Sequence, residues 1–320
     1  MVLEVSNLMV HYQTMDGYVK AVDGVSFSID KGEALAIVGE SGCGKSTLAL
    51  SILRLLPKNA KIVGGSIILK PDGIDLTKLS ETEMRKIRGR KIGMVFQDPM
   101  TYLNPAMKIG NQIAESLVCH DQLTWNEARE RAVELLSRLK IPDPANVATR
   151  YPHQLSGGMK QRVMIAIAIS CNPDLLVADE PTTALDVTVQ AEVLELLKSL
   201  IQEMGMSLIL ITHDLGIVAE ICDKVAIMYA GKIVEQADVY TIYKSPLHPY
   251  TMGLLKAAAT VSGSEGNVES IPGTTPSLLN PPSGCRFHPR CPFVFDKCPK
   301  TEPPIIKIDD NHEVACWLRE

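Results

Sequence analysis

Short, continuously apolar runs recur through residues 1–235 and predict strands that are covered on both faces. The clearest runs are Ala34–Val38, Ile92–Phe96, Leu175–Ala178, Leu208–Ile211 and Val225–Tyr229. Apolar positions at helical spacing separate several of them. The longest such segment, residues 189–204, is followed by Gly205, a typical helix stop. Strands that alternate with helices predict an α/β fold with a mainly parallel sheet.

Residues from about 97 to 157 interrupt this alternation, and their pattern predicts a helical insertion. Thr124 and Glu127 have capping-box spacing, and the apolar positions that follow, as far as Lys140, lie on one face of a helix. Ser80 and Glu83 form a second capping-box pattern further upstream.

The two ends of the chain differ from this α/β region. Val2–Val10 and Ala21–Ile29 predict strands of a smaller antiparallel sheet. Beyond residue 236, frequent prolines and the polar segment Ser262–Ser270 predict a linker or an extended appendage rather than more sheet. The expected organisation is a domain over residues 1–235 and a C-terminal extension over residues 236–320.

Composition and charge narrow the classes of function. The 320 residues are 46% hydrophobic and 22% charged, as in an ordinary globular protein, and the net charge of −5 gives no support to nucleic acid as the main partner. The longest apolar run, Val163–Ile169, is far shorter than the roughly 18–20 residues that span a bilayer. The N-terminus has no export pattern. We therefore expect any membrane association to be indirect.

A phosphate-binding loop follows the first buried run. The sequence from Gly39 to Ser46 has the pattern G-x-x-x-x-G-K-S between a predicted strand and a predicted helix. Its glycines let successive N–H groups face one concavity, and Lys45 can reach the β- and γ-phosphates. Ser46 is a natural Mg²⁺ ligand, and Thr47 can contact the α-phosphate. The other predicted nucleotide-binding residues of the loop are Gly39, Ser41, Gly42, Cys43 and Gly44. The thiol of Cys43 lies near a helix N-terminus, which can lower its pKa, although a tolerated small residue is the simpler interpretation.

Polar residues follow three other predicted strands. Asp179 and Glu180 end a buried run, where α/β sheets place ligands, so Asp179 would bind Mg²⁺ and Glu180 would polarise the attacking water. Gln97 follows Ile92–Phe96 and could contact both Mg²⁺ and that water. His213 follows Leu208–Ile211, where a lone histidine is usually structural.

A second predicted anion-binding helix start distinguishes among phosphate-loop proteins. Leu155–Arg162 reads L-S-G-G-M-K-Q-R, in which Ser156 resembles an N-cap and Gly157 and Gly158 leave N–H groups uncovered. A small-molecule kinase would not explain this motif.

Together these motifs resemble the ABC ATPases over about residues 1–235. In that family's pattern, Gly39–Thr47 is the Walker A loop, Gln97 the Q-loop, Leu155–Met159 the signature, Asp179 and Glu180 the Walker B carboxylates, Thr183–Asp186 the D-loop and His213 the switch histidine. Tyr12 is at the position that stacks on adenine, with Tyr18 as a second candidate. The resemblance implies a RecA-like core, Mg²⁺-dependent ATP hydrolysis, and catalytic roles for Glu180, His213 and Gln97. Met159 and Thr183 differ from the commoner residues, Gln and Ser, without removing a phosphate donor.

Further motifs resemble the dipeptide and oligopeptide permease ATPases over essentially the whole chain. They are Gln97–Pro105, His248–Thr251, Ile271–Gly273 and the cysteines of the tail. The resemblance implies peptide import at the cytoplasmic face of the membrane. It also implies a second, related ATPase, two transmembrane permease subunits and an extracytoplasmic peptide-binding protein. ATP would lie between two ATPase chains, so Ser156, Gly157 and Gly158 would serve the partner's nucleotide.

Four of the eight cysteines, Cys285, Cys291, Cys298 and Cys316, lie close together in the last part of the chain. A chain without an export pattern is expected to keep its thiols reduced, which favours metal binding over disulfides. A segment of under roughly 40 residues also rarely folds unless a metal or a crosslink stabilises it. Spacing alone favours Zn²⁺, with His288 or His312 as substitute ligands, and unligated thiols are the other alternative. The permease resemblance instead implies a four-cysteine [4Fe–4S] centre within residues 285–316, with a structural or assembly role. Phe287, Phe293, Phe295 and Trp317 could shield it from water.

Two other functions remain open from the sequence. A non-transport ABC ATPase of translation or DNA repair would keep the same ATP site, but would usually add a second cassette or a long coiled-coil insertion. An ATP-regulated sensor centred on a metal cluster in the tail is the other alternative.

Overall fold

The computed structural model describes residues 1–183, 185–261 and 271–320. These residues divide into two compact units: unit 1 comprises Met1–Lys78 and Leu210–Glu320, and unit 2 comprises Leu79–Ile209. Ala184 of the predicted D-loop and the predicted linker Ser262–Ser270 lie outside the described residues. Unit 1 thus includes the predicted C-terminal extension. The boundary at residue 235 between an ATPase domain and this extension stays a prediction.

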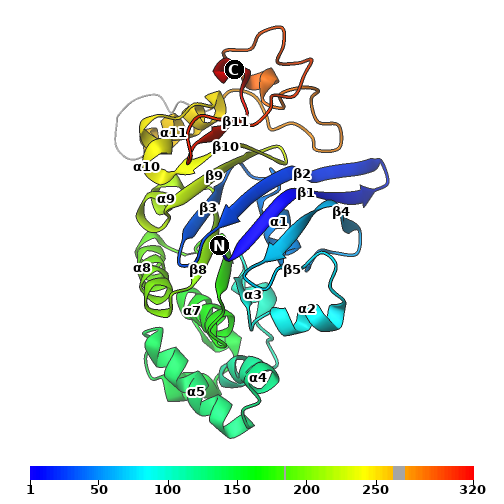
Figure 1. The fold of residues 1–320 in the computed structure, drawn as a ribbon. Coiled ribbons are helices and arrows are strands. Elements are labelled where there is room, and N and C mark those ends of the chain that lie inside the picture. Colours follow the sequence, from blue (N-terminus) through cyan, green and yellow to red (C-terminus); the bar gives the residue numbers. More distant parts are fainter. Residues whose placement is uncertain (184, 262–270) are drawn as a thin grey trace. The chain divides into compact units, whose positions relative to one another are not determined.

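Unit 1 contains the predicted antiparallel sheet (Figure 1). Its strand order is β2 (Gly17–Ile29), β1 (Leu3–Thr14), β4 (Ala60–Leu69) and β5 (Ile74–Asp75). The sequence pattern does not predict β4, which contains a pair of glycines. Gly65 has a φ of 82°, and a Cβ atom there would lie 2.4 Å from the carbonyl oxygen of Asn7. The glycine thus permits the close approach at the register shift between β1 and β4.

A second group of strands in unit 1 includes the C-terminal tail. β3 (Ala34–Val38) pairs in parallel with β9 (Lys224–Tyr229), and β9 pairs antiparallel with β10 (Lys232–Asp238). β12 (Glu313–Val314) then pairs with β10, and β11 (Ile306–Lys307) with β12. The prediction that the tail adds no sheet is therefore wrong, because strands of two residues are too short to show a period of two.

Helices cover much of unit 1. They are α1 (Lys45–Ile52), α9 (Leu215–Ile221), α10 (Val239–Lys244) and α11 (Pro249–Val261), with 3₁₀ turns η2 (His288–Arg290) and η3 (Trp317–Arg319) in the tail. The segment after residue 236 is thus less extended than predicted. The chain passes from unit 2 into unit 1 within β8 (Ser207–Thr212).

Unit 2 carries the predicted helical insertion. Its two strands, β6 (Ile92–Val95) and β7 (Leu175–Asp179), are parallel neighbours. Its helices are α2 (Glu81–Ile87), α3 (Pro99–Tyr102), α4 (Ile109–Asp121), α5 (Trp125–Arg138), α6 (Pro144–Thr149), η1 (Pro152–Gln154), α7 (Gly157–Ile169) and α8 (Val187–Met204). α4 and α5 pack side by side (Figure 1).

Local sequence signals explain the helix ends of unit 2. Ser80 and Thr124 make the predicted capping boxes with Glu83 and Glu127, which satisfy N–H groups at the start of α2 and α5. Gly205 ends α8 with a φ of 61°. Among the described residues, no helix has the length and apolar character that crossing a bilayer requires.

Candidate functional site

The phosphate loop of unit 1 needs glycine at defined positions. The buried strand β3 leads into Gly39, and Gly44 caps the start of α1 with a φ of 108°. A Cβ atom on Gly39 would lie 2.1 Å from the carbonyl oxygen of Met228, and one on Gly44 would lie 2.0 Å from that of Ala21. Both carbonyl oxygens belong to the backbone and cannot move aside without a large cost in free energy. Any side chain at Gly39 or Gly44 would therefore distort the loop.

Lys45 is buried at the first position of α1, and its ammonium is anchored by the loop itself. Its Nζ donates to the carbonyl oxygen of Gly39 at 2.7 Å and to that of Glu40 at 3.1 Å. The next residue, Ser46, is exposed at the helix start. The lysine charge is therefore held against the loop backbone, at the position where the motif predicts phosphate binding.

Tyr12 contacts the helix that follows the loop. Its hydroxyl shares a hydrogen bond of 3.1 Å with the hydroxyl of Thr47, whereas the alternative candidate Tyr18 is 60% exposed on β2. Cys43 is buried, and this burial raises the pKa of its thiol. The possibility of a lowered pKa for Cys43 is therefore wrong, and the residue packs as a small apolar side chain.

In unit 2, the structure brings together Gln97 and Glu180. The parallel strands β6 and β7 end at the same edge, so the residues that follow them are neighbours. Nε2 of Gln97 and Oγ1 of Thr183 each donate to Oε2 of Glu180 at 2.9 Å. Asp179, at the end of β7, is buried. The hydrogen bond from Thr183 could not be predicted from the motif spacing.

Glu180 also has an unusual backbone. Its φ of 45° lies in the left-handed region, which a residue other than glycine rarely adopts. Such strain costs about 1–3 kcal/mol and is concentrated at functional sites. The strained backbone and the two side-chain donors fix the direction of the Glu180 carboxylate.

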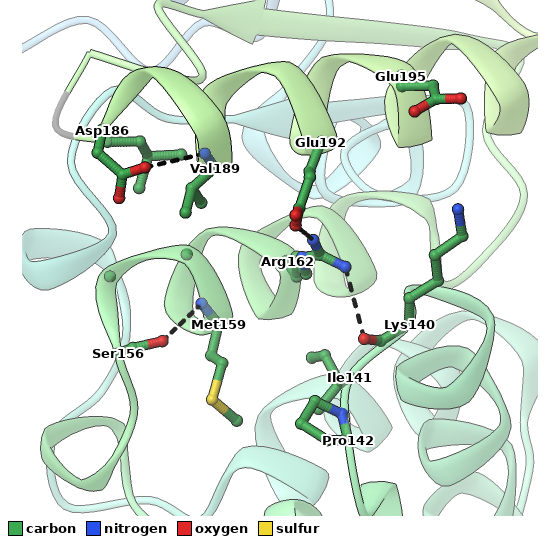
Figure 2. A pocket seen from close by; sticks show the side chains of 13 residues that line it. Lys140, Ile141, Pro142, Ser156, Met159, Arg162, Asp186, Val189, Glu192 and Glu195 are labelled. Carbon is green, nitrogen blue, oxygen red and sulfur yellow. Dashed lines mark hydrogen bonds and ion pairs between the residues drawn. The ribbon is translucent and has the colours of Figure 1, made fainter.

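The predicted signature begins α7 in unit 2 beside a pocket of about 750 Å³ (Figure 2). Ser156 is the N-cap, and its Oγ accepts from the N–H of Met159 at 3.4 Å. Ser156 and Gly157 are exposed, and a Cβ atom on Gly158 would lie 2.6 Å from Cγ1 of Val189. The pocket is lined by Lys140, Ile141, Pro142, Ser156, Gly157, Gly158, Met159, Arg162, Leu185, Asp186, Val189, Glu192 and Glu195.

One ion pair crosses the wall of this pocket. Nη2 of Arg162 lies 2.7 Å from Oε2 of Glu192, and its Nη1 donates to the carbonyl oxygen of Leu139 at 3.0 Å (Figure 2 shows the pair with Glu192). The guanidinium thus ties α7 to α8 and to the end of α5. Gly157 is therefore exposed at the start of α7, whereas Gly158 is half-buried and allows α7 to approach α8 closely.

His213 lies at an exposed position directly after β8, in unit 1. The next residue, Asp214, caps α9 by accepting a hydrogen bond of 2.8 Å from the N–H of Gly216. The cap fixes the chain direction beside His213.

The donors predicted for Mg²⁺ fit its chemistry. Ser46, Gln97 and Asp179 supply a hydroxyl, an amide and a carboxylate oxygen, and Mg²⁺ prefers such hard oxygen ligands.

The four cysteines of the tail are free, and Cys298 and Cys316 are buried. The N–H of Cys285 donates to the carbonyl oxygen of Cys298 at 2.8 Å. The pKa of Cys285 is raised to about 11, mainly by burial and to a smaller extent by the charges of Cys316, Cys298 and Cys291. Four thiols are the kind and number of ligands that a [4Fe–4S] cluster requires.

No group of three or more His, Cys, Asp or Glu side chains is arranged to hold a metal ion in the part of the chain that the structure describes. The geometry of the described residues therefore supports neither the zinc alternative nor the four-cysteine [4Fe–4S] centre. Nε2 of His312 lies 2.8 Å from Oε1 of the buried Glu235, and Nδ1 of His288 lies 2.9 Å from the carbonyl oxygen of Cys285.

The predicted aromatic shield of the tail is largely absent. Phe293 and Phe295 are 55% and 42% exposed, so the prediction is wrong for these two residues. Phe287 is buried, but it packs against Tyr229 and Tyr250. Exposed rings cannot exclude water from the thiols.

Two protein families match successive parts of the chain. Residues 22–183 match the family described as ABC transporter, and residues 234–298 match the oligopeptide/dipeptide transporter C-terminal region. The oligopeptide transport ATP-binding protein AppD of Bacillus subtilis is 50% identical over 99% of this chain and 97% of its own length. The chain belongs to the ABC transporter family.

Other similar proteins support the same family assignment for this ABC ATPase. The dipeptide transport ATP-binding protein DppD of Bacillus subtilis is 49% identical over 100% of this chain and 95% of its own length. The dimeric ATP-binding cassette MJ0796, bound to ADP and Pi, is 31% identical with a TM-score of 0.66, over 74% of this chain and 98% of that chain. The predicted fold class is confirmed, and this ABC ATPase hydrolyses ATP.

Proposed function

We propose that this ABC ATPase powers the import of short peptides. The observation that carries the proposal is the pair of family matches, an ABC transporter region followed by the oligopeptide/dipeptide transporter C-terminal region. Relatives named for peptide, oligopeptide and dipeptide transport are about as long as this chain and 49–50% identical to it. In this proposal, residues 1–235 form the ATPase domain and residues 236–320 the extension typical of peptide transporters.

The residues of the ATP site would divide the work of phosphoryl transfer, which depends on positioning and charge stabilisation. Lys45 neutralises charge on the β- and γ-phosphates, and Ser46 and Asp179 would hold Mg²⁺, which stabilises the leaving phosphate when bound. Glu180 accepts the proton of the attacking water. The hydrogen bond from Gln97 aims the Glu180 carboxylate, and His213 would contact the γ-phosphate. The bond between Gln97 and Glu180 supports this division of roles.

The signature would serve the nucleotide of a partner ATPase. Ser156 and Gly157 are exposed at a helix start beside an open pocket, which suits contact with phosphate oxygens of another chain. The other proposed partners are two transmembrane permease subunits and, indirectly, an extracytoplasmic peptide-binding protein. The ATPase would therefore be a peripheral protein at the cytoplasmic face of the membrane. The segment from Gln97 to Pro105 would carry motion to the permease.

Reconstitution tests this proposal. The purified chain should hydrolyse ATP slowly, because its signature can complete a site only across an interface. Vesicles that also contain the second ATPase and both permease subunits should turn over ATP about 10²-fold faster, the scale on which positioned donors act. With the binding protein present, they should accumulate labelled dipeptide or tripeptide with ATP but not with ADP. Equal turnover by the isolated chain would contradict the shared site, and turnover without peptide accumulation would contradict import.

We further propose that Cys285, Cys291, Cys298 and Cys316 bind a [4Fe–4S] cluster with a structural or assembly role. The number and type of the free cysteines within the tail support it. The ATP site does not need the cluster for its chemistry, and no catalytic step passes through it.

Iron and sulfide content checks the cluster. Anaerobically purified protein should be brown and contain about four iron and four sulfide per chain. Cys298→Ser should lose most of this iron, whereas Cys119→Ser, which alters an exposed cysteine of α4, should retain it. Colourless protein with stoichiometric zinc and no sulfide would contradict the cluster.

A further inference from the structure

Glu40, the second residue of the phosphate loop, is held by residues far away in the sequence. Its carboxylate accepts two hydrogen bonds from Arg290, from Nη1 to Oε2 at 2.7 Å and from Nη2 to Oε1 at 3.0 Å. Its N–H donates to the hydroxyl of Tyr250 at 2.9 Å. Both contacts come from the segment after residue 236, which sequence analysis treated as an appendage.

Arg290 is fixed in one orientation. Its side chain is 5% exposed, its Nε donates to the carbonyl oxygen of Pro272 at 2.9 Å, and Nη2 also donates to that of Ile271 at 3.2 Å. The guanidinium carbon lies 5.8 Å from the ring centroid of Tyr229. A planar guanidinium with all three nitrogens engaged offers Glu40 a rigid, two-pronged partner.

Tyr250 is equally constrained. It is fully buried near the start of α11. Its ring centroid lies 4.6 Å from that of Tyr229 and 5.4 Å from that of Phe287. This aromatic cluster joins β9, α11 and the tail. The packing therefore fixes the position of the Tyr250 hydroxyl, which accepts a hydrogen bond from the N–H of Glu40.

Glu40 in turn begins the turn that curls the phosphate loop. Its carbonyl oxygen accepts from the N–H of Cys43 at 3.3 Å and from Nζ of Lys45 at 3.1 Å. Between these residues, Ser41 and Gly42 are exposed. The position of Glu40 thus sets both the direction of the turn and one of the two anchors of Lys45.

We propose that Arg290 and Tyr250 are positioning residues of the ATP site, which hold the phosphate loop through Glu40. Arg290 also neutralises a carboxylate that would otherwise repel the nearby phosphates. The C-terminal segment is then part of the ATP-binding structure, whichever cargo the transporter carries. The inference goes beyond peptide import, because it concerns only this chain and its nucleotide.

A double-mutant cycle on the full chain tests the inference, with the dissociation constant for Mg·ATP measured by calorimetry. Arg290→Ala should raise this constant about tenfold, the scale of one charge-assisted hydrogen bond. Arg290→Lys keeps the charge without the fork and should have a smaller effect. In a Glu40→Gln background, Arg290→Ala should change the constant less than about twofold, because the partner charge is already absent.

Arg286→Ala is the matched control. Arg286 belongs to the same segment and is also buried, but it pairs with Asp23 and donates to the carbonyl oxygen of Ala230. Arg286→Ala should leave the dissociation constant for Mg·ATP within about twofold of the wild-type value. This limit is the same as the one set for Arg290→Ala in the Glu40→Gln background. Equal effects of Arg286→Ala and Arg290→Ala would overturn the inference, as would an effect of Arg290→Ala that is unchanged in the Glu40→Gln background. Should Arg290→Ala not fold, Arg290→Lys in both backgrounds decides in the same way.

Discussion

Glu180→Gln is expected to preserve ATP binding and to lower ATP hydrolysis by about 10²–10⁴-fold, the scale of losing a positioned proton acceptor. The amide can still accept the hydrogen bonds that Gln97 and Thr183 donate to Oε2 of the native carboxylate. The geometry should therefore survive while the base is lost. Phosphate release by the reconstituted transporter measures the rate, and calorimetry measures the affinity for Mg·ATP.

Glu203→Gln is the control for this change. Glu203 is an exposed residue near the end of α8 that pairs with Arg138, and an exposed pair of this kind contributes little to stability. Its turnover should match wild type. Turnover near wild type in Glu180→Gln itself would remove the assignment of Glu180 as the proton acceptor.

Lys45→Ala should weaken the binding of Mg·ATP by about 10–100-fold, the range for losing hydrogen bonds to a charged group. The buried ammonium also bridges the carbonyl oxygens of Gly39 and Glu40, so its removal loosens the loop as well as removing charge. Calorimetric titration of the full chain measures the effect. Lys58→Ala, at an exposed position beyond α1, should bind as wild type does. Unchanged affinity in Lys45→Ala would show that the phosphates are bound elsewhere.

The ATP-site residues could be predicted because their chemistry depends on local spacing. The two ends of the phosphate loop need glycine, since Gly39 and Gly44 lie against the carbonyl oxygens of Met228 and Ala21. The required glycines can therefore be recognised within eight consecutive residues of the sequence, from Gly39 to Ser46. The capping boxes before α2 and α5 are equally local, because each needs only residues three positions apart.

The missed features depend on partners that are distant in sequence. Glu40 stands 250 positions before Arg290, and no local pattern pairs them. The aromatic residues of the tail show a related limit. Phe287 and Phe293 each follow a cysteine by two positions, yet the first is buried and the second exposed. Composition can indicate that rings are near the cysteines, but only tertiary packing decides which of them face inward.

The pairing of β12 with β10 has a consequence for how the protein behaves among its copies. Without the tail, β10 would lack the partner strand that β12 provides at Glu235 and Gln236, and this edge would be open to pairing with another chain. With the tail in place, the outermost strand is β11, which has two residues and carries Lys307. A strand so short and charged offers little for a neighbouring molecule to extend. The tail thus covers part of an edge at which a neighbouring molecule could otherwise add a strand.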